Sequence, residues 1–213
     1  MPALFVGIIM HVSYGLAGKI TTFHLDRDMD KLNEEWLDHQ INFYFRYKRK
    51  LLESMIEGTC VNVGCGSHVI ENAVNIDEGL PELPYPENSF DTVICSDVLE
   101  HVGRHHRKAL AELMRVARKK VIITVPAYRW LYGKYDRLVG HFRRYHAKDF
   151  PDYETSYLFW FLVPIIYLRK TFNLKHRLLP KFVDDLFFAL AHIRFNFGTT
   201  VLAVKYKTPA ATK

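Results

Sequence analysis

A short β-branched segment that breaks into Gly-x-Gly is the feature that most constrains this chain. Residues 60–67 are Cys-Val-Asn-Val-Gly-Cys-Gly-Ser, and residues 74–77 are Val-Asn-Ile-Asp. The first pattern predicts a buried parallel strand that ends in a tight turn, where a ligand can approach the backbone. In open α/β sheets the ligand lies outside the carboxyl ends of the strands, and an acid on the neighbouring strand holds ribose hydroxyls. We therefore expect Gly64, Cys65 and Gly66 to form this turn and Asp77 to contact a ribose. A purely structural turn explains Gly-x-Gly alone equally well.

A longer pattern follows this turn. Residues 83–91 are Leu-Pro-Tyr-Pro-Glu-Asn-Ser-Phe-Asp, an apolar run comes next, and residues 96–102 are Ser-Asp-Val-Leu-Glu-His-Val. Together with Val-Gly-Cys-Gly, this segment resembles the class I S-adenosylmethionine (SAM) dependent methyltransferases, in particular their type 11 domain. The resemblance covers roughly Thr59 to Val125. It implies a methyltransferase that uses SAM as cofactor.

The resemblance implies an α/β fold with a Rossmann-like, mostly parallel class I methyltransferase sheet. The segments Glu154 to Leu162 and Thr199 to Tyr206 match the antiparallel strand pair at the end of that sheet. Between Gly66 and Asp77 there is room for barely two helical turns, so the first helix is trimmed. Only six residues separate Asp77 from Pro84, too few for a crossover helix and a third strand. We therefore expect the outer edge strand to be missing. For the chain as a whole we expect residues 1–58 to form a helical cap, residues 59–207 the methyltransferase domain and residues 208–213 a disordered tail.

The resemblance also assigns a cofactor site. It places SAM against Gly64, Cys65, Gly66 and Asp77, with further contacts from the residues at the ends of the following segments, namely Leu83, Ser96 and Asp97. Asn62 departs from the family, which often has an acid two residues before the first glycine. An amide can hydrogen-bond but supplies no charge to the methionine ammonium of SAM. Asn62 remains a predicted SAM contact on that weaker basis.

The loop from Tyr128 to Tyr145 leaves the ligand edge of the predicted sheet. It is similar to a family subset with an Asp followed by His-x-Arg-Arg-Tyr, here the set Asp136, His141, Arg143, Arg144 and Tyr145. These groups can orient an acceptor or bind its phosphate. They can equally lock the loop through an ion pair between Asp136 and Arg144. The sequence leaves both hypotheses open.

Two histidines are candidates for catalysis. The SAM sulfonium is already activated, so holding the acceptor in line with the methyl group can supply most of the rate. If the acceptor is a hydroxyl group, a general base is useful, and His101 and His141 are the candidates. A packed or helix-capping role is the alternative for His101. The sequence shows no metal-binding motif.

The apolar positions between Asp30 and Glu57 recur at helical spacing. Lys48 falls on the apolar face, so we expect its stem to lie along that face while the ammonium reaches water. The apolar stretch from Pro2 to Gly18 lacks a basic region and is too short to span a bilayer, so it does not resemble a signal peptide. A lid, a membrane-surface helix and an upstream extension before Met29 remain alternatives for it.

Composition bears on partners and compartment. The formal charge is +6 with a pI near 9.1, which suits an anionic partner or simply a basic cytosolic protein. Three cysteines give no disulfide framework and favour a reducing, cytoplasmic compartment. The apolar run from Leu158 to Leu168 predicts a core strand with a buried turn, or a membrane-surface contact. We expect a small-molecule, glycan or lipid-linked acceptor. A noncatalytic SAM- or nucleotide-binding subunit and an RNA methyltransferase are the alternatives, and the oligomeric state is not predicted.

Overall fold

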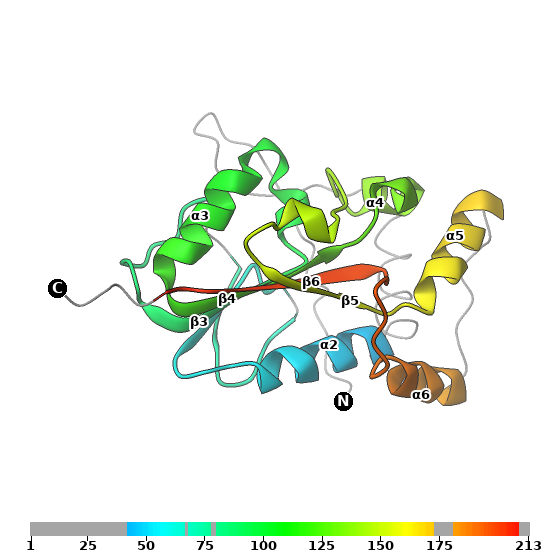
Figure 1. Ribbon diagram of the computed structural model, residues 1–213, viewed down its shortest axis with the longest axis horizontal. Coiled ribbons are helices and arrows are strands. Elements are labelled where there is room, and N and C mark those ends of the chain that lie inside the picture. Colours follow the sequence, from blue (N-terminus) through cyan, green and yellow to red (C-terminus); the bar gives the residue numbers. More distant parts are fainter. Residues whose placement is uncertain (1–41, 67, 78–79, 173–180, 209–213) are drawn as a thin grey trace, which may run out of the picture.

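The computed structural model describes residues 42–66, 68–77, 80–172 and 181–208. Predictions about the N-terminal stretch, Met29 and the tail lie outside these residues. A six-stranded sheet forms the centre of the fold (Figure 1). Its strands are β1 Cys60–Val63, β2 Val74–Ile76, β3 Phe90–Ser96, β4 Ala117–Pro126, β5 Glu154–Leu158 and β6 Thr200–Tyr206. The helices are α2 Asn42–Ser54, α3 His106–Val116, α4 Lys134–Leu138, α5 Leu162–Phe172 and α6 Lys181–Leu190, with 3-10 turns at Leu99–His101, Gly103–His105, Arg129–Leu131 and Ala147–Asp149.

The strand order is β2-β1-β3-β4-β6-β5. β1 pairs in parallel with β2 and β3, β3 pairs in parallel with β4, and β6 pairs antiparallel with both β4 and β5. This confirms the predicted Rossmann-like sheet with its antiparallel pair at the C-terminal end. The carboxyl ends of β1, β2, β3 and β4 consequently meet at one edge, where open α/β sheets bind ligands.

β2 is the edge strand, as the short connection after Asp77 predicts. Among the described residues between Asp77 and Phe90 there is neither a further strand nor a helix. The trimmed first helix predicted between Gly66 and Asp77 differs from the structure, because the described residues 68–73 are not helical. The chain is simply too short in both places for the missing elements.

Two cores lie on opposite faces of the sheet. On one face Leu113 of α3 packs with Val121 and Ile123 of β4. On the other face Phe43 and Leu52 of α2 pack with Ile122 of β4. The alternation along β4 follows from the two-residue repeat of a strand. Figure 1 shows the result as three layers, with α3 on one side of the sheet and α2 and α6 on the other.

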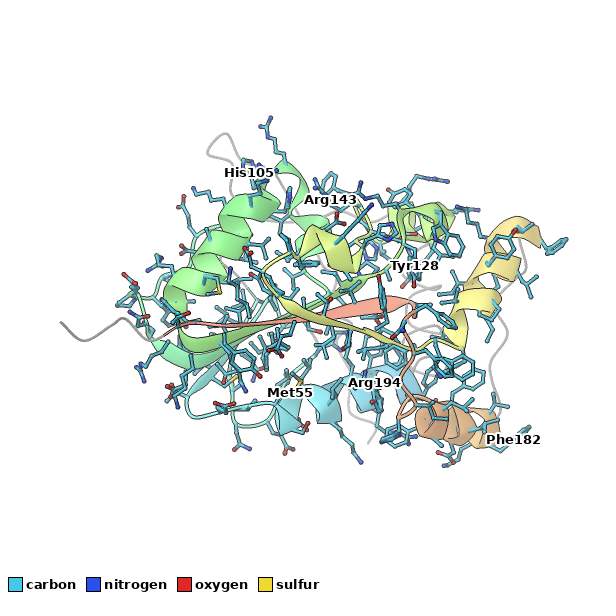
Figure 2. The ribbon with its side chains drawn as sticks, in the orientation of Figure 1. Met55, His105, Tyr128, Arg143, Phe182 and Arg194 are labelled. Atoms are coloured by element: carbon cyan, nitrogen blue, oxygen red, sulfur yellow. The ribbon has the colours of Figure 1, made fainter. Side chains whose placement is uncertain are left out.

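The core-strand alternative for the apolar run from Leu158 to Leu168 is right only at its start. Leu158, Phe159 and Phe161 are buried, but the chain then forms α5, in which no residue is fully buried. Phe172 on α5 is 65% exposed and Phe182 on α6 is 72% exposed, and Figure 2 shows Phe182 on α6, away from the sheet. An apolar run of this length fits a strand or a helix equally well, which is why its pattern misled the prediction.

Candidate active site

The glycine turn after β1 is joined to the end of β2. The amides of Gly64 and Cys65 donate to the carbonyl of Ile76 at 2.7 and 3.0 Å. The amide of Gly66 donates to Oδ1 of Asp77 at 2.9 Å. Asp77 itself is exposed at the carboxyl end of β2. The turn and the acid therefore lie side by side at the ligand edge of the sheet, as predicted.

Two glycines of this turn have left-handed backbone conformations, with φ of +69° at Gly64 and +47° at Gly66. A Cβ at Gly64 would lie 2.6 Å from Val98, so glycine is required there for packing. A Cβ at Gly66 would meet nothing closer than Asp77 Oδ1, at 4.0 Å. The space beside Gly66 is thus open next to a carboxylate, and this arrangement fits the ribose end of SAM.

A cavity of about 210 Å³ lies between α2 and the ends of β1 and β3. Its lining includes Lys48, Asn62, Cys65, His68 and Ser96. The volume is below the roughly 300 to 1,000 Å³ of typical small-molecule sites. The cavity therefore suits part of a cofactor of SAM's size.

Lys48 does not reach water, contrary to the prediction for the apolar face of this helix. It is 4% exposed, and its ammonium forms an ion pair with Asp97 at the end of β3. Oδ1 of Asp97 also accepts a hydrogen bond from Thr124 at 3.1 Å. Burial alone would raise the pKa of Asp97, but Lys48 and Thr124 together hold it below its usual value. A buried ammonium needs a carboxylate partner, and this requirement overrides the preference for solvent.

Asp97 has a φ of +55°, a left-handed conformation that is uncommon for a residue other than glycine. Such conformations cluster at functional sites, where the surrounding contacts hold them in place. Here the amide of Asp97 donates to the carbonyl of Thr124 at 2.8 Å. Ser96, the preceding residue, shares a 2.8 Å hydrogen bond with the Thr124 hydroxyl. The end of β3 is thus fixed by β4.

Two predicted SAM contacts have structural partners. The side-chain amide of Asn62 is buried and donates to the carbonyl of His68 and to Oδ1 of Asn75, both at 2.9 Å. The Leu83 side chain packs in the core, and its backbone amide donates to Glu112 at 2.7 Å. Contact of these two residues with SAM remains a prediction.

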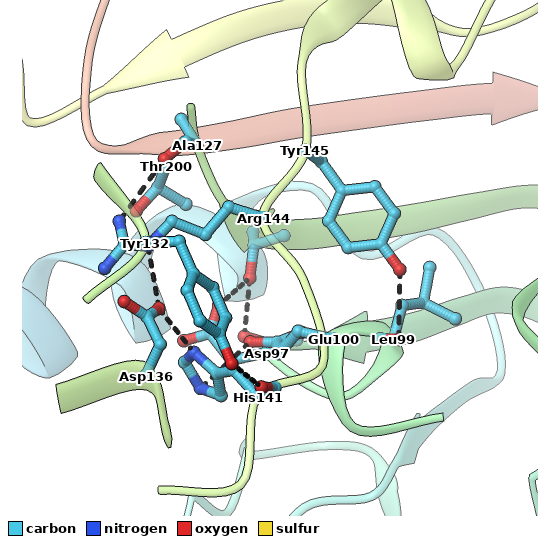
Figure 3. A network of polar contacts seen from close by, with 12 residues as sticks. Asp97, Leu99, Glu100, Ala127, Tyr132, Asp136, His141, Arg144, Tyr145 and Thr200 are labelled. Carbon is cyan, nitrogen blue, oxygen red and sulfur yellow. Dashed lines mark hydrogen bonds and ion pairs between the residues drawn. The ribbon is translucent and has the colours of Figure 1, made fainter. Parts of the chain in front are cut away.

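Asp136, at the start of α4, is the centre of the loop between β4 and β5 (Figure 3). Its carboxylate accepts hydrogen bonds from Arg144 Nε at 2.7 Å and from the Gly133 amide at 2.8 Å, and it lies 3.0 Å from His141 Nδ1. Asp136 and Arg144 are both buried. Burial opposes ionisation of Asp136, but the hydrogen bonds from His141 and Arg144 outweigh it and lower the pKa. The Asp136–Arg144 ion pair of the locking hypothesis is therefore present.

The other predicted acceptor contacts also bind within the protein. Arg143 donates to the carbonyl of Gly103 at 2.6 Å and lies 3.2 Å from His106 Nδ1. The Tyr145 hydroxyl donates to the carbonyl of Leu99 at 3.0 Å. Both contacts tie the loop to the segment after β3, which favours locking. Direct acceptor contact by Arg143, Arg144 or Tyr145 remains a prediction.

The structure brings the two candidate catalytic histidines together. The rings of His101 and His141 are 4.7 Å apart at 80° to each other. Burial, and then the neighbouring His141, lower the pKa of His101 to about 4. A base this weak is poorly matched to proton abstraction at neutral pH. His141, oriented through Nδ1 by Asp136, is the better placed of the two imidazoles.

The structure also adds Glu100, which the sequence analysis did not single out. Glu100 is fully buried, and its Oε1 lies 3.8 Å from His141 Nε2. Burial and the charge of Asp97 raise the pKa of Glu100 well above its usual value. The signal was an acid placed between apolar residues in Val-Leu-Glu-His-Val. Lys48 gave a similar signal, as a lysine on the buried face of a helix.

The comparisons with known proteins agree with the fold. The Methyltransferase domain family matches residues 67–125. The fold is similar to that of a SAM-dependent methyltransferase of Thermotoga maritima, with 14% identity, 85% of this chain and 97% of that chain covered, and a TM-score of 0.54. It is also similar to a chain from a complex between the Trm112 methyltransferase activator of Haloferax volcanii and a methyltransferase, with 11% identity, 85% and 95% covered, and a TM-score of 0.50. No curated protein shows a significant match.

Proposed function

We propose, for a chain with the sequence signature and fold of class I SAM-dependent methyltransferases, that it transfers the methyl group of SAM to an acceptor bound beside Glu100, His101 and His141. One observation carries the proposal: the open glycine turn with Asp77 and the segment that begins at Asp97 lie at the carboxyl edge of one parallel sheet. The edge offers one end to a nucleoside and the other to an acceptor.

Gly66 and Asp77 would hold the ribose end of the cofactor, and the cavity beneath α2 would receive the methionine part. The cofactor supplies a methyl group that its sulfonium already activates. Lys48 lines that cavity with its ammonium already paired with Asp97, so the two charges together would face the methionine part. The protein then needs mainly to position the acceptor. Effective molarities indicate that such positioning can lower the activation barrier by several kcal/mol.

The locked loop between β4 and β5 would keep water from the acceptor side of the site. The amide of Phe142 donates to the carbonyl of Glu100 at 2.8 Å, which joins the loop to the segment after β3. The Tyr132 hydroxyl donates to the carbonyl of His141 at 2.8 Å. Loop and segment therefore form one wall beside His141 (Figure 3). A rigid wall of this kind preserves the geometry on which positioning depends.

Of the predicted acceptor classes, a lipid-linked acceptor has the most support. Exposed apolar side chains are frequent on α5, α6 and the following segment, and we call this set the apolar surface: Tyr167, Leu168, Phe172, Phe182, Leu186, Ile193, Phe195 and Phe197. Basic residues accompany them, including the exposed Lys170, Lys181 and Arg194. Large exposed apolar surfaces mark interaction sites, and apolar side chains with basic neighbours suit anionic lipid surfaces. No helix among the described residues is long and apolar enough to cross a bilayer.

The direct test is a turnover screen that follows S-adenosylhomocysteine production with lipids, glycans, small metabolites and RNA as acceptors. We expect turnover by the wild-type chain with an acceptor from one of the first three groups, and strongly reduced turnover by Asp77→Ala. Folded protein that makes no S-adenosylhomocysteine with any acceptor would instead support a noncatalytic subunit. Turnover with RNA alone would support the other alternative. Neither alternative is favoured by the sequence signature or the fold.

A further inference from the structure

One cluster combines metal-ligating groups with a lack of internal partners. The ligand atoms of Glu100, His101 and His141 all lie within 4.8 Å of one another. The Glu100 side chain is 0% exposed, and neither of its carboxylate oxygens has a hydrogen-bond partner. A buried polar group without partners is costly, and in native proteins such a group points to a missing ligand or water.

Both imidazoles are held from behind. Nδ1 of His141 is 3.0 Å from Asp136 Oδ1, so its Nε2 is left facing Glu100. The ring of His101 is hydrogen-bonded to the backbone of Gly140. Metal-bound histidines usually have this arrangement, in which one nitrogen donates to a carboxylate or a carbonyl and the other binds the ion.

We propose that Glu100, His101 and His141 bind a divalent transition-metal ion, with Asp136 and the Gly140 backbone orienting the two imidazoles. Two imidazoles and one carboxylate suit Zn²⁺, and also Mn²⁺, Fe²⁺ or Co²⁺. Three protein ligands is the number found in catalytic zinc sites, where the remaining position takes water or substrate.

The place of this cluster suggests what the open position receives. Glu100 and His101 follow Asp97 at the end of β3, and His141 comes from the loop that closes the same edge. Resting on the proposed function, we assign the open position to an oxygen or nitrogen atom of the methyl acceptor. Nε2 of His141 would then use its lone pair to bind the ion and could not accept a proton from the acceptor. The ion would promote loss of that proton by lowering the pKa of the bound acceptor group.

The test is titration of the chelator-stripped, tag-free full chain with Co²⁺, without SAM or acceptor, followed by visible absorption. We expect one Co²⁺ per chain, displaced by Zn²⁺. Glu100→Gln and His141→Ala should each abolish stoichiometric binding, and Asp136→Asn should weaken it by about 10- to 100-fold. His105→Ala, on the neighbouring 3-10 turn, is the matched control and should bind as wild type does.

Thermal melts separate a lost site from a lost fold. Without metal, Glu100→Gln should melt close to the wild-type temperature, because it exchanges one buried polar group without a partner for another of the same shape. Added Zn²⁺ should raise the melting temperature of wild type and not that of Glu100→Gln. A wild-type chain that binds no Co²⁺, Zn²⁺ or Mn²⁺, or variants that bind as wild type does, would overturn the proposal and point to a buried water. SAM binding is measured separately, in the presence of a chelator. A chain that binds SAM but no metal would overturn the metal site and leave the proposed function intact.

Discussion

Asp136→Asn is the change whose effect follows most directly from the structure. It keeps the shape of the side chain but removes the charge that neutralises Arg144, whose guanidinium is buried. Removing one partner of a buried ion pair costs about 3 to 5 kcal/mol, because the other charge stays buried without compensation. For a domain of this size, each kcal/mol lowers the melting temperature by roughly 2 to 4 °C. We therefore expect Asp136→Asn to melt about 6 to 20 °C below wild type.

The measurement is a thermal melt by circular dichroism at neutral pH in the presence of a chelator. Lys181→Ala is the matched control, since its ion pair with Asp185 is exposed and such pairs contribute about 0.2 to 1 kcal/mol. Adding Arg144→Met to Asp136→Asn removes the unpaired charge and should restore part of the loss. An Asp136→Asn protein that melts with the control, or a double variant that is less stable than Asp136→Asn, would refute the locking role.

Three further predictions concern pH, the buried lysine and the apolar surface. The pKa of His101 is about 4 in the folded chain, below its usual value, so the unfolded chain binds more protons between pH 6.5 and 4 and stability should fall as the pH is lowered through this window. The measurement is urea unfolding of metal-free protein at pH 7 and pH 5. The free energy of unfolding that wild type loses between these pH values should be about 2 kcal/mol smaller in His101→Gln. The same loss in both proteins would contradict the burial of a neutral imidazole. Lys48→Met leaves Asp97 without its cation and should cost about 3 kcal/mol, partly recovered by adding Asp97→Asn; no recovery would mean that the pair is not coupled. Phe182→Ser should reduce sedimentation with anionic phospholipid vesicles, whereas Val74→Ser, at the other end of the sheet and 48% exposed, should not; equal binding by the two variants would remove α6 from the contact.

The sheet was predictable because its signals are local. A β-branched run before Gly64 predicts a strand that ends in a turn, and the position of Asp77 follows from the next short apolar run. The missing edge strand follows from chain length alone, because six residues cannot form a crossover helix and a strand. The same local pattern located the glycine turn and the acid beside it. These features depend on residues close together in the sequence.

The features that the sequence did not reveal depend on contacts between distant segments. Lys48 and Asp97 lie on different elements, and neither position predicts that the other will neutralise it. The meeting of Glu100 with His141 depends on how the loop after β4 folds back on the segment after β3. Periodicity says which face of an element is buried but not which polar groups meet there. For this reason the candidate SAM turn was predicted and the histidine–carboxylate cluster was not.

Calorimetry with the cofactor tests most directly whether SAM occupies the edge formed by β1, β2 and β3. Isothermal titration calorimetry of S-adenosylhomocysteine should show binding of one molecule per chain. Asp77→Ala should weaken this binding by roughly 10- to 100-fold, because a hydrogen bond to a charged group contributes about 1.5 to 3 kcal/mol. Asp152→Ala, which removes an exposed carboxylate beside β5, should leave the affinity unchanged. Equal affinities for wild type and Asp77→Ala would remove Asp77 from the site. A folded wild-type chain that binds neither SAM nor S-adenosylhomocysteine would contradict a SAM site at this edge of the sheet.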